Sequence, residues 1–286
     1  MTANATVLEM VDSLPPFRLL ALIIKAFAKT QETYDTRSLI DVIKDEPSIT
    51  AKVIGMANTA YYRSGDPVGS VESAVARLGI QVLRRLVLAL AMSERFDSSR
   101  CPGFNARRHW FDAMAVAHCA CNINAAIDSA KNHNDSTVYC IALLHNIGFL
   151  LLVHSYPQTT NEIICNGTAT LINDEREVFS GDDHYSAGGM LLRHWGLPPL
   201  FYQTIAQLNT DAFEEVQYHV QLIIFAKSLI DGFIYRKNFD EMPDLIIDKR
   251  GMRMGDMVLC TNTVTTMRAE IQGQIQVLEP MLRGLV

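Results

Sequence analysis

The sequence predicts an all-α fold, and three observations support that prediction. Apolar residues recur at helical spacing, as at Leu83, Leu86, Val87 and Leu90, and no run of strict alternation indicates a strand. The stretches between the expected helices are short, and none has the composition of a flexible linker. The chain has 286 residues and is 49% hydrophobic and 20% charged, which suits a globular protein with a large core.

Capping and helix-breaking residues set the expected helix boundaries in order. In the first half, helices are expected over residues 17–29, 36–44, 48–58, 70–79, 81–95 and 106–130. Pro47 suits the first position of a helix and Ser70 an N-cap. In the second half, helices are expected at 138–154, from 156, and at 167–179, 183–196, 198–208, 213–233 and 255–279. Asp183 suits an N-cap, and Gly196 followed by Pro198 indicates a helix end.

The stretch Val138–His154 is apolar on nearly every face, so its helix should be buried all round. It nevertheless carries His145 and Asn146 in its middle. Burying two polar side chains without hydrogen bonds is unfavourable. Both residues should therefore have partners, either as satisfied core groups or as parts of a site.

Composition and charge exclude several classes of function. The net charge of −6 gives no overall basic field for nucleic acid, so no specific nucleic-acid binding is expected. The six cysteines form no CxxC pair and indicate reduced thiols, which favours a cytoplasmic protein. The N-terminus lacks the pattern of a signal peptide. Polar residues interrupt the apolar runs before the roughly 18 residues of a membrane span, so no membrane partner is expected.

Four segments in order resemble the bacterial HDOD domain, a relative of the HD metal-dependent phosphohydrolases. They are PSITAKVIGMANTAYY, SVESAVARLGIQVLRRLVLALA, ALLHNIGFLLL and DHYSAGGMLLRHWGLP. The resemblance covers residues 14–209, leaving 1–13 as a lead-in and 210–286 as a C-terminal helical extension packed on the same domain. It implies an N-terminal helical subdomain packed on an HD-like helical bundle, in a bacterial signalling context.

The resemblance also implies where the metal ligands of the phosphohydrolases would fall. The first histidine corresponds to Asp112, the defining His-Asp pair to His145-Asn146, and the histidine of the next motif to His184. The lysine that follows the His-Asp pair is replaced by Phe149. The later double histidine falls on Leu208-Asn209, and the last aspartate falls on Lys227.

These replacements favour a degenerate site, in which only His145 and His184 keep a ligand type. Asn146 is a poor substitute for a bridging carboxylate, and an ammonium at Lys227 would repel a divalent ion. We therefore expect a vestigial pocket in which Lys227 pairs with Asp112, while His145, Asn146 and His184 complete a polar cluster. No catalytic residue, cofactor or metal is expected.

Two function classes follow from this interpretation. The first is a non-catalytic signalling or scaffolding protein of the HDOD type that binds a protein partner or a small ligand. The alternative is a phosphohydrolase that holds a divalent metal and acts on a nucleotide or cyclic dinucleotide.

Two surface features could take part in binding. Arginines near the 95–103 loop could contact an anion or an acidic partner, or simply form a solvated face; they are Arg84, Arg85, Arg107 and Arg108, with Arg95 and Arg100 nearby. Near the C-terminus an apolar stripe could pack on the protein's own bundle or support a homo-oligomer; it consists of Val264, Met267, Ile271, Ile275, Leu278 and Leu282.

Overall fold

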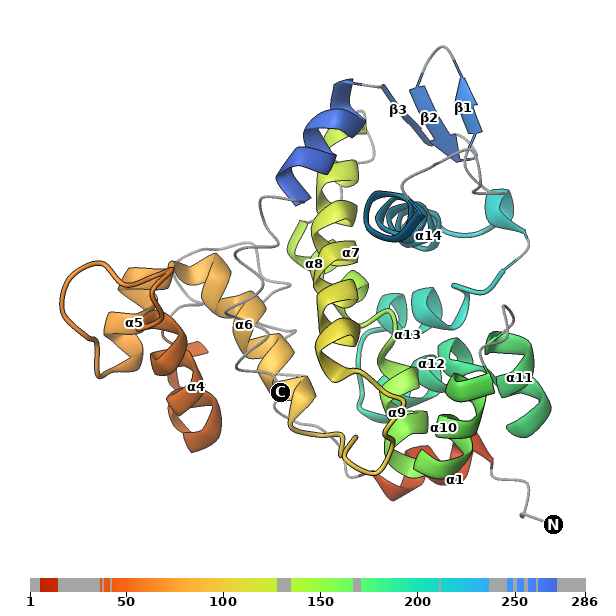
Figure 1. Ribbon diagram of the computed structural model, residues 1–286, viewed down its shortest axis with the longest axis horizontal. Helices are drawn as coiled ribbons and strands as arrows, with labels where there is room; N and C mark the ends of the chain where they lie inside the picture. The colour runs from red at the N-terminus through yellow and green to blue at the C-terminus, as the bar shows by residue number, and fades with distance from the viewer. Residues whose placement is uncertain are drawn as a thin grey trace. The chain divides into compact units, whose positions relative to one another are not determined.

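The structure, a computed structural model, is predominantly helical, which confirms the all-α class (Figure 1). It describes residues 6–14, 37, 39–41, 43–127, 135–166, 171–210, 212–236, 246–248, 251–254, 257–260 and 262–271. The helix expected at 17–29 lies outside these residues, and the described residues of the one expected at 36–44 are helical. The chain divides into two compact units, residues 17–95 with 273–286 and residues 1–16 with 96–272.

Among the described residues of the smaller unit, the helices α4 (Pro47–Ala57), α5 (Val71–Leu78) and α6 (Ile80–Ser93) pack on one another. Pro47 begins α4, and the Ser70 hydroxyl caps α5 by accepting from the backbone N–H of Ser73, both as predicted. Gly79 has a φ of 79°, a left-handed conformation that favours glycine, and it separates α5 from α6.

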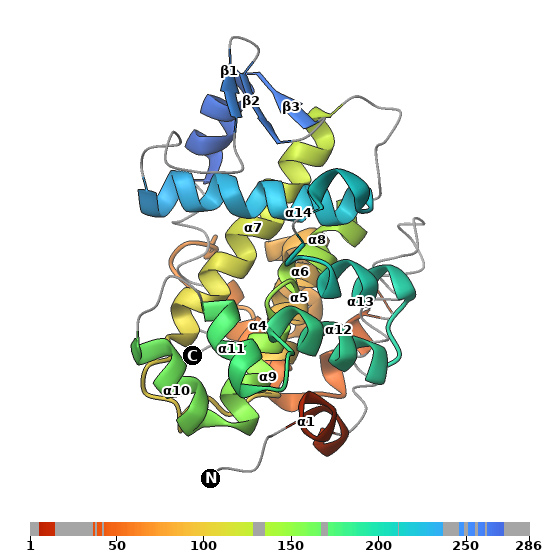
Figure 2. The same ribbon diagram turned by 90° about the vertical axis from the view of Figure 1, so that its right-hand side faces the viewer.

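In the larger unit the long helix α7 (Ala106–Ala126) packs on α8 (Asp135–Leu143) and on α14 (Tyr218–Ile230). Figure 2 shows α14 crossing α7. The Asn105 side chain caps α7 by accepting from the backbone N–H of Arg108 at 2.9 Å. The single helix expected at 213–233 is instead three segments, because the 3-10 turn η2 (Phe213–Glu215) precedes α14 and the π-helix η3 (Asp231–Arg236) follows it.

Five helices form the other part of this unit: α9 (Ile147–Ser155), α10 (Pro157–Asn166), α11 (Leu171–Val178), α12 (His184–His194) and α13 (Pro199–Ala206). Helix α12 lies between α9 and α13 and packs on both. The expected lead-in at 1–13 contains α1 (Val7–Ser13), which also packs on α9 and α12. The imidazole of His194, at the end of α12, donates to the backbone oxygen of Leu14 at 3.0 Å and so attaches this segment to α12.

The apolar stretch expected as one helix is two helices, α8 and α9, joined by a turn at 144–146. The whole stretch Asp135–Ser155 is long and apolar enough to cross a membrane by length and composition, so the expectation that no stretch reaches that length was wrong. However, 83% of its most apolar window is buried inside the protein. The stretch therefore supplies the core of the unit, as its all-round apolar character predicted.

Gly148 explains how α9 and α12 approach so closely. A Cβ atom at Gly148 would lie 1.8 Å from the backbone oxygen of His184 and 2.4 Å from the backbone nitrogen of Gly188. Only a residue without a side chain fits at this crossing. The crossing places the turn at 144–146 beside the start of α12, where the site residues lie.

A small antiparallel sheet interrupts the expected C-terminal helical extension. Its strands β1 (Ile246–Asp248), β2 (Gly251–Met254) and β3 (Met257–Leu259) pair in the order β1-β2-β3. A helix follows over residues 262–271 rather than beginning at 255. It buries Val264, Met267 and Ile271, and Asn122 of α7 donates to Glu270 at 3.0 Å. This half of the apolar stripe packs on its own unit; Ile275, Leu278 and Leu282 lie outside the described residues.

Candidate functional site

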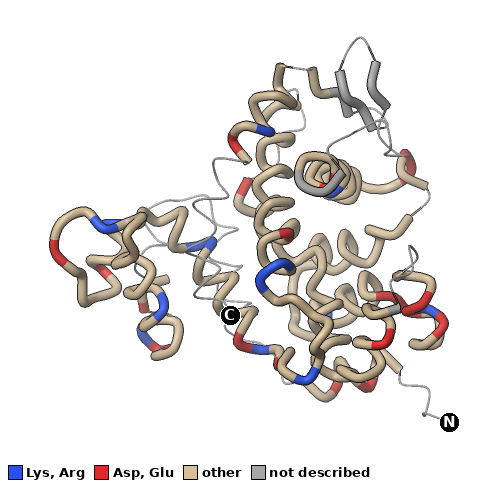
Figure 3. The backbone as a smooth tube through the Cα atoms, viewed as in Figure 1, with Lys and Arg blue, Asp and Glu red and all other residues tan. Residues whose placement is uncertain are grey.

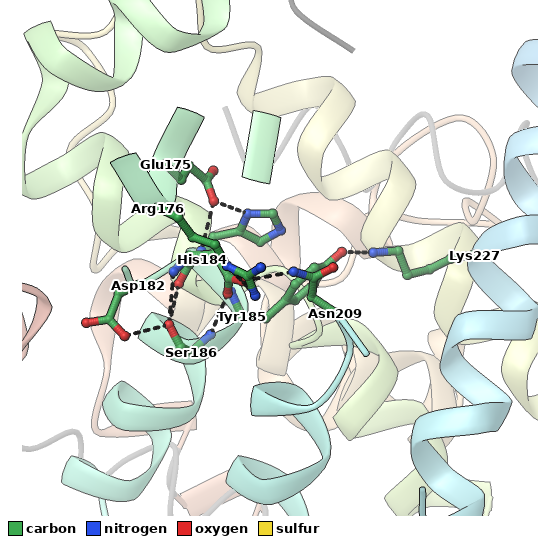
Figure 4. Close-up of polar contacts among 9 residues, drawn as sticks. Glu175, Arg176, Asp182, His184, Tyr185, Ser186, Asn209 and Lys227 are labelled. Carbon is green, nitrogen blue, oxygen red and sulfur yellow. Dashed lines mark hydrogen bonds and ion pairs between the residues drawn. The ribbon is translucent and has the colours of Figure 1, made fainter. Parts of the chain in front are cut away.

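A buried pair joins His184, at the start of α12, to Glu175 on α11 (Figure 4). The Glu175 Oε2 atom accepts from the His184 backbone N–H at 2.9 Å and from its Nδ1 at 2.7 Å. Glu175 is 1% exposed and His184 5% exposed. The two bonds fix the orientation of the imidazole ring, and Nδ1 carries the proton that is donated to the carboxylate.

Asp183 holds the same end of α12, as its cap position predicted. Its Oδ1 accepts from the backbone N–H groups of Tyr185 and Ser186, both at 3.0 Å. Its Oδ2 accepts from Arg176 at 2.8 Å and from the Asn209 amide at 3.1 Å. Asn209, which stands where the resemblance expects a histidine, therefore stabilises the cap of α12 (Figure 4).

His145 lies in the turn between α8 and α9 and is buried. Its Nδ1 lies 2.7 Å from the backbone oxygen of Ala142, so Nδ1 carries the proton and Nε2 is free to accept. Burial lowers the pKa of His145 well below its usual value, and the Lys227 ammonium lowers it further. His145 is therefore a neutral imidazole at physiological pH, and it lies within the electrostatic reach of Lys227.

Lys227, on α14, reaches the aromatic side chain of Tyr185. Its ammonium donates to the Tyr185 hydroxyl and lies 4.4 Å from the centre of the ring (Figure 4). Burial lowers the pKa of Lys227 from 10.5 to about 8, and no carboxylate among the described residues raises it. The partner of the Lys227 ammonium is thus a phenol, where a carboxylate had been expected.

Asp112 lies on α7 with its carboxylate 3.8 Å from the Arg108 guanidinium, one helical turn away. The side chain is 33% exposed, unlike the buried groups around His184. Asp112 and Lys227 were predicted to pair with each other. In the structure Asp112 instead pairs with Arg108, and Lys227 bonds Tyr185.

His109 is a member of the cluster that the sequence pattern did not indicate. It is 9% exposed, and burial lowers its pKa to about 3, with His184 contributing in the same direction. Phe104 lies 5.4 Å from the His109 ring and 5.9 Å from Phe149, and Phe149 lies 5.7 Å from His184, all between ring centres. Phe149, in place of the lysine that the resemblance expects, thus packs against the site histidine.

The side chains brought together do not fit the divalent metal that the resemblance implies. Among the described residues, no group of three or more His, Cys, Asp or Glu side chains is placed to hold a metal ion. The buried imidazoles of His109 and His145 are neutral, the Lys227 ammonium lies within electrostatic reach of His145, and the carboxylate of Glu175 is bonded to His184. A divalent-metal site needs carboxylates or neutral imidazoles that converge on the ion, and a neighbouring ammonium repels that ion.

The predicted arginine contacts divide between the two units. Arg84 and Arg85 lie on α6, where Arg84 is 8% exposed, so it is a core residue rather than a surface contact. Arg107 and Arg108 lie exposed at the start of α7 in the other unit. Figure 3 shows Lys and Arg at separated points along the described chain.

Comparison with known families now identifies the architecture. The model of the HDOD domain matches residues 14–210. The chain belongs to the HDOD domain family. The match ends one residue beyond the boundary predicted from the sequence motifs, and it includes α4 to α13 and all site residues except Lys227.

Solved HDOD-like structures share the fold at low sequence identity. An HDOD domain protein of unknown function from Geobacter sulfurreducens is 19% identical, with 98% of each chain covered and a TM-score of 0.66. A candidate phosphohydrolase from Shewanella amazonensis SB2B is 20% identical, with 99% of each chain covered and a TM-score of 0.68. A candidate signal transduction protein from Marinobacter aquaeolei VT8 is 18% identical, with a TM-score of 0.73. The alignment covers all of this HDOD chain and 62% of the Marinobacter chain.

Among curated proteins, an uncharacterized protein of Treponema pallidum (strain Nichols) is 21% identical over 253 residues. That alignment covers 84% of this chain and 46% of the relative, so the HDOD chain spans less than half the length of that relative. At these identities the likeness to the solved structures concerns the fold.

Proposed function

We propose that this HDOD protein is a non-catalytic signal-transduction or scaffolding protein that acts by binding a protein partner or a small ligand. The observation that carries the proposal is the Lys227 ammonium, held by Tyr185 beside the neutral imidazole of His145. A cation at this position opposes a divalent ion, and without the ion no water is activated for attack on phosphorus.

Two buried acceptors support the binding of a small ligand at the same cluster. Asn146 Oδ1 and Glu175 Oε1 are buried and have no hydrogen-bond partner among the described residues. Leaving a buried acceptor unpaired costs about 1–3 kcal/mol. A ligand with N–H or O–H donors, or ordered water, would remove that cost. This ligand is no cofactor of a reaction, and its binding is the signal.

The cellular setting belongs to the same proposal. We propose a bacterial, cytoplasmic protein, because all six cysteines are free and the most apolar stretch is buried within the fold. A partner in a signalling pathway and a homo-oligomer through the C-terminal helix remain parts of this proposal. Nucleic acid and membrane are not proposed as partners, since the net charge is −6.

The first experiment separates the proposed function from phosphohydrolase activity. The purified chain is loaded with Mn²⁺ or Zn²⁺, its metal content is measured, and turnover is assayed with a nucleotide and a cyclic dinucleotide. We expect less than one tenth of a metal ion per chain and no turnover. Stoichiometric metal with turnover that is lost in His145→Ala and His184→Ala would establish the phosphohydrolase instead.

A gain-of-binding variant sharpens this test. The double substitution Asn146→Asp with Lys227→Asp removes the cation and restores two carboxylates, and it should increase metal binding relative to the wild type. The matched control is Gln158→Glu with Arg193→Glu, which makes the same charge changes at exposed positions outside the cluster. Equal metal uptake by wild type and both variants would contradict the role assigned to Lys227.

A second experiment addresses the ligand. Native mass spectrometry of the full chain, purified without denaturant, should reveal a retained small molecule or a shift in mass on titration with candidate metabolites. The same measurement on Lys227→Met and His145→Phe should show weaker retention, and the distant control Lys44→Met should retain the wild-type level. If all variants retained the small molecule equally, the ligand would bind outside the cluster that contains Lys227 and His145.

A further inference from the structure

The turn before α7 carries a cysteine and is bonded to the end of α10. Within the turn, Cys101 donates its backbone N–H to Ser98 at 3.1 Å, and Phe104 donates to the Cys101 oxygen at 3.0 Å. The backbone N–H of Gly103 donates to the Asn161 side chain of α10 at 2.7 Å. The turn is therefore fixed against one face of α10.

That face of α10 carries a second cysteine. Cys165 follows Asn161 by four residues, so both side chains lie on the same side of the helix. A Cβ atom at Gly103 would lie 3.4 Å from the Cys165 sulfur, which is ordinary contact distance. The Cys165 thiol therefore lies against the turn, two residues from Cys101.

The two thiols differ in a way that suits sequential oxidation. Cys165 is exposed, whereas Cys101 is 1% exposed. Burial raises the pKa of the Cys101 thiol, and the Cys165 thiol raises it further, in keeping with the contact between Cys165 and the turn. An oxidant in solvent thus meets Cys165 first, with Cys101 behind it as a protected thiol.

We propose that Cys101 and Cys165 form a peroxide-oxidised thiol pair whose disulfide ties the turn before α7 to α10. The Cys165 thiolate attacks hydrogen peroxide, the O–O bond breaks, and Cys165 sulfenic acid and hydroxide are formed. The Cys101 thiol then loses its proton and attacks the Cys165 sulfur, which releases a second hydroxide. The two thiol protons neutralise the hydroxides, so two thiols and one peroxide give one disulfide and two waters.

The position of the pair connects it with the histidine cluster. Phe104 ends the turn that Cys101 begins, and its ring lies 5.4 Å from His109 and 5.9 Å from Phe149. A disulfide at Cys101 would restrict the turn and with it the position of Phe104. This inference does not rest on the proposed function, because it concerns the chemistry of the two sulfurs.

The test uses the full reduced chain. Hydrogen peroxide is added at stoichiometric and tenfold excess, free thiols are blocked with an alkylating reagent, and the peptides are mapped by mass spectrometry. We expect a cross-linked peptide pair joining Cys101 to Cys165, the loss of two free thiols, and reversal by a dithiol reductant. The cross-link closes a long loop, so the oxidised chain should unfold about 5 °C or more above the reduced chain.

Two single variants and one control complete the design. Cys165→Ser, at an exposed position, should abolish the cross-link and the thermal shift. Cys101→Ser should leave Cys165 as a sulfenic or sulfinic acid. Cys260→Ser removes another exposed thiol and should behave as the wild type. Oxidation of Cys165 without a bond to Cys101 in the wild-type chain, or a peroxide-induced thermal shift that survives in Cys165→Ser, would overturn the proposal.

Discussion

The ammonium of Lys227 and the phenol of Tyr185 are hydrogen-bonded to each other across the site, from α14 to α12. The ammonium also lies over the Tyr185 ring, 4.4 Å from its centre. The lysine is therefore held by a neutral aromatic residue, and this contact takes the place of the carboxylate pairing expected from the sequence.

A double-mutant cycle measures this contact. Tyr185→Phe removes the hydroxyl and Lys227→Met removes the ammonium, and the coupling between the two should be about 1–2 kcal/mol in the free energy of unfolding. The comparison cycle pairs Asp112→Ala with Lys227→Met, and its effects should add within about 0.5 kcal/mol. Urea unfolding at pH 7 provides both values. A larger coupling energy in the Asp112 cycle than in the Tyr185 cycle would instead support the Asp112–Lys227 pair predicted from the sequence.

The depressed pKa of Lys227 makes stability depend on pH. In the folded chain Lys227 titrates at about 8, and in the unfolded chain at about 10.5. Between these values the unfolded state binds more protons, so the free energy of unfolding should rise with pH. The buried Lys227 ammonium lowers the free energy of unfolding by its full amount below pH 8, and this destabilisation disappears by pH 10.5. It should be on the order of 2–3 kcal/mol, given that Lys227 is partly accessible.

The control for this pH effect is Lys227→Met. Other lysines, tyrosines and cysteines also titrate in the range, so the measured quantity is the difference between wild type and variant. Urea unfolding is followed for both proteins from pH 7 to pH 10. The wild type should gain stability relative to the variant as the pH rises. A constant difference would mean that the folded Lys227 keeps its ordinary pKa.

Gly148 should tolerate no side chain. Gly148→Ala would place a methyl group 1.8 Å from the His184 backbone oxygen, so α9 and α12 would have to separate, at about 3 kcal/mol in the free energy of unfolding. Gly55→Ala, within α4, has no atom within 4 Å of the added methyl and should stabilise by about 0.5–1 kcal/mol. Thermal and urea unfolding compare the two variants. Equal effects would refute the close helix crossing.

Glu175 should support the fold through His184. Glu175→Ala leaves two buried donors unpaired, the backbone N–H and the Nδ1 of His184, and should cost about 3 kcal/mol. Glu175→Gln keeps an acceptor oxygen and should cost about 1 kcal/mol. Glu177→Ala, exposed on the same helix, should change stability by less than about 0.5 kcal/mol. Equal losses for the alanine and glutamine variants of Glu175 would contradict this role.

Capping and helix-breaking residues predicted much of the fold, because each acts on the backbone of residues next to it in the chain. Pro47 begins α4, Asp183 caps α12, and Gly196, at a φ of 73°, lies just beyond the end of α12. The order and spacing of four motifs also gave the family and a boundary at residue 209, one residue from the end of the family match. The small sheet at 246–259 was missed, since its strands are only three or four residues long.

The sequence by itself determined the helical class and the buried stretch around His145, and the resemblance led to the prediction that the Lys227 cation belongs to the site. Only the tertiary structure decided which side chains meet that cation. Tyr185 on α12, which bonds the cation, and His109 on α7 both lie far along the chain from Lys227 on α14, and no periodicity in the sequence indicates that they converge. Helix crossings decide such contacts, and the α9–α12 crossing exists because Gly148 lets two backbones touch.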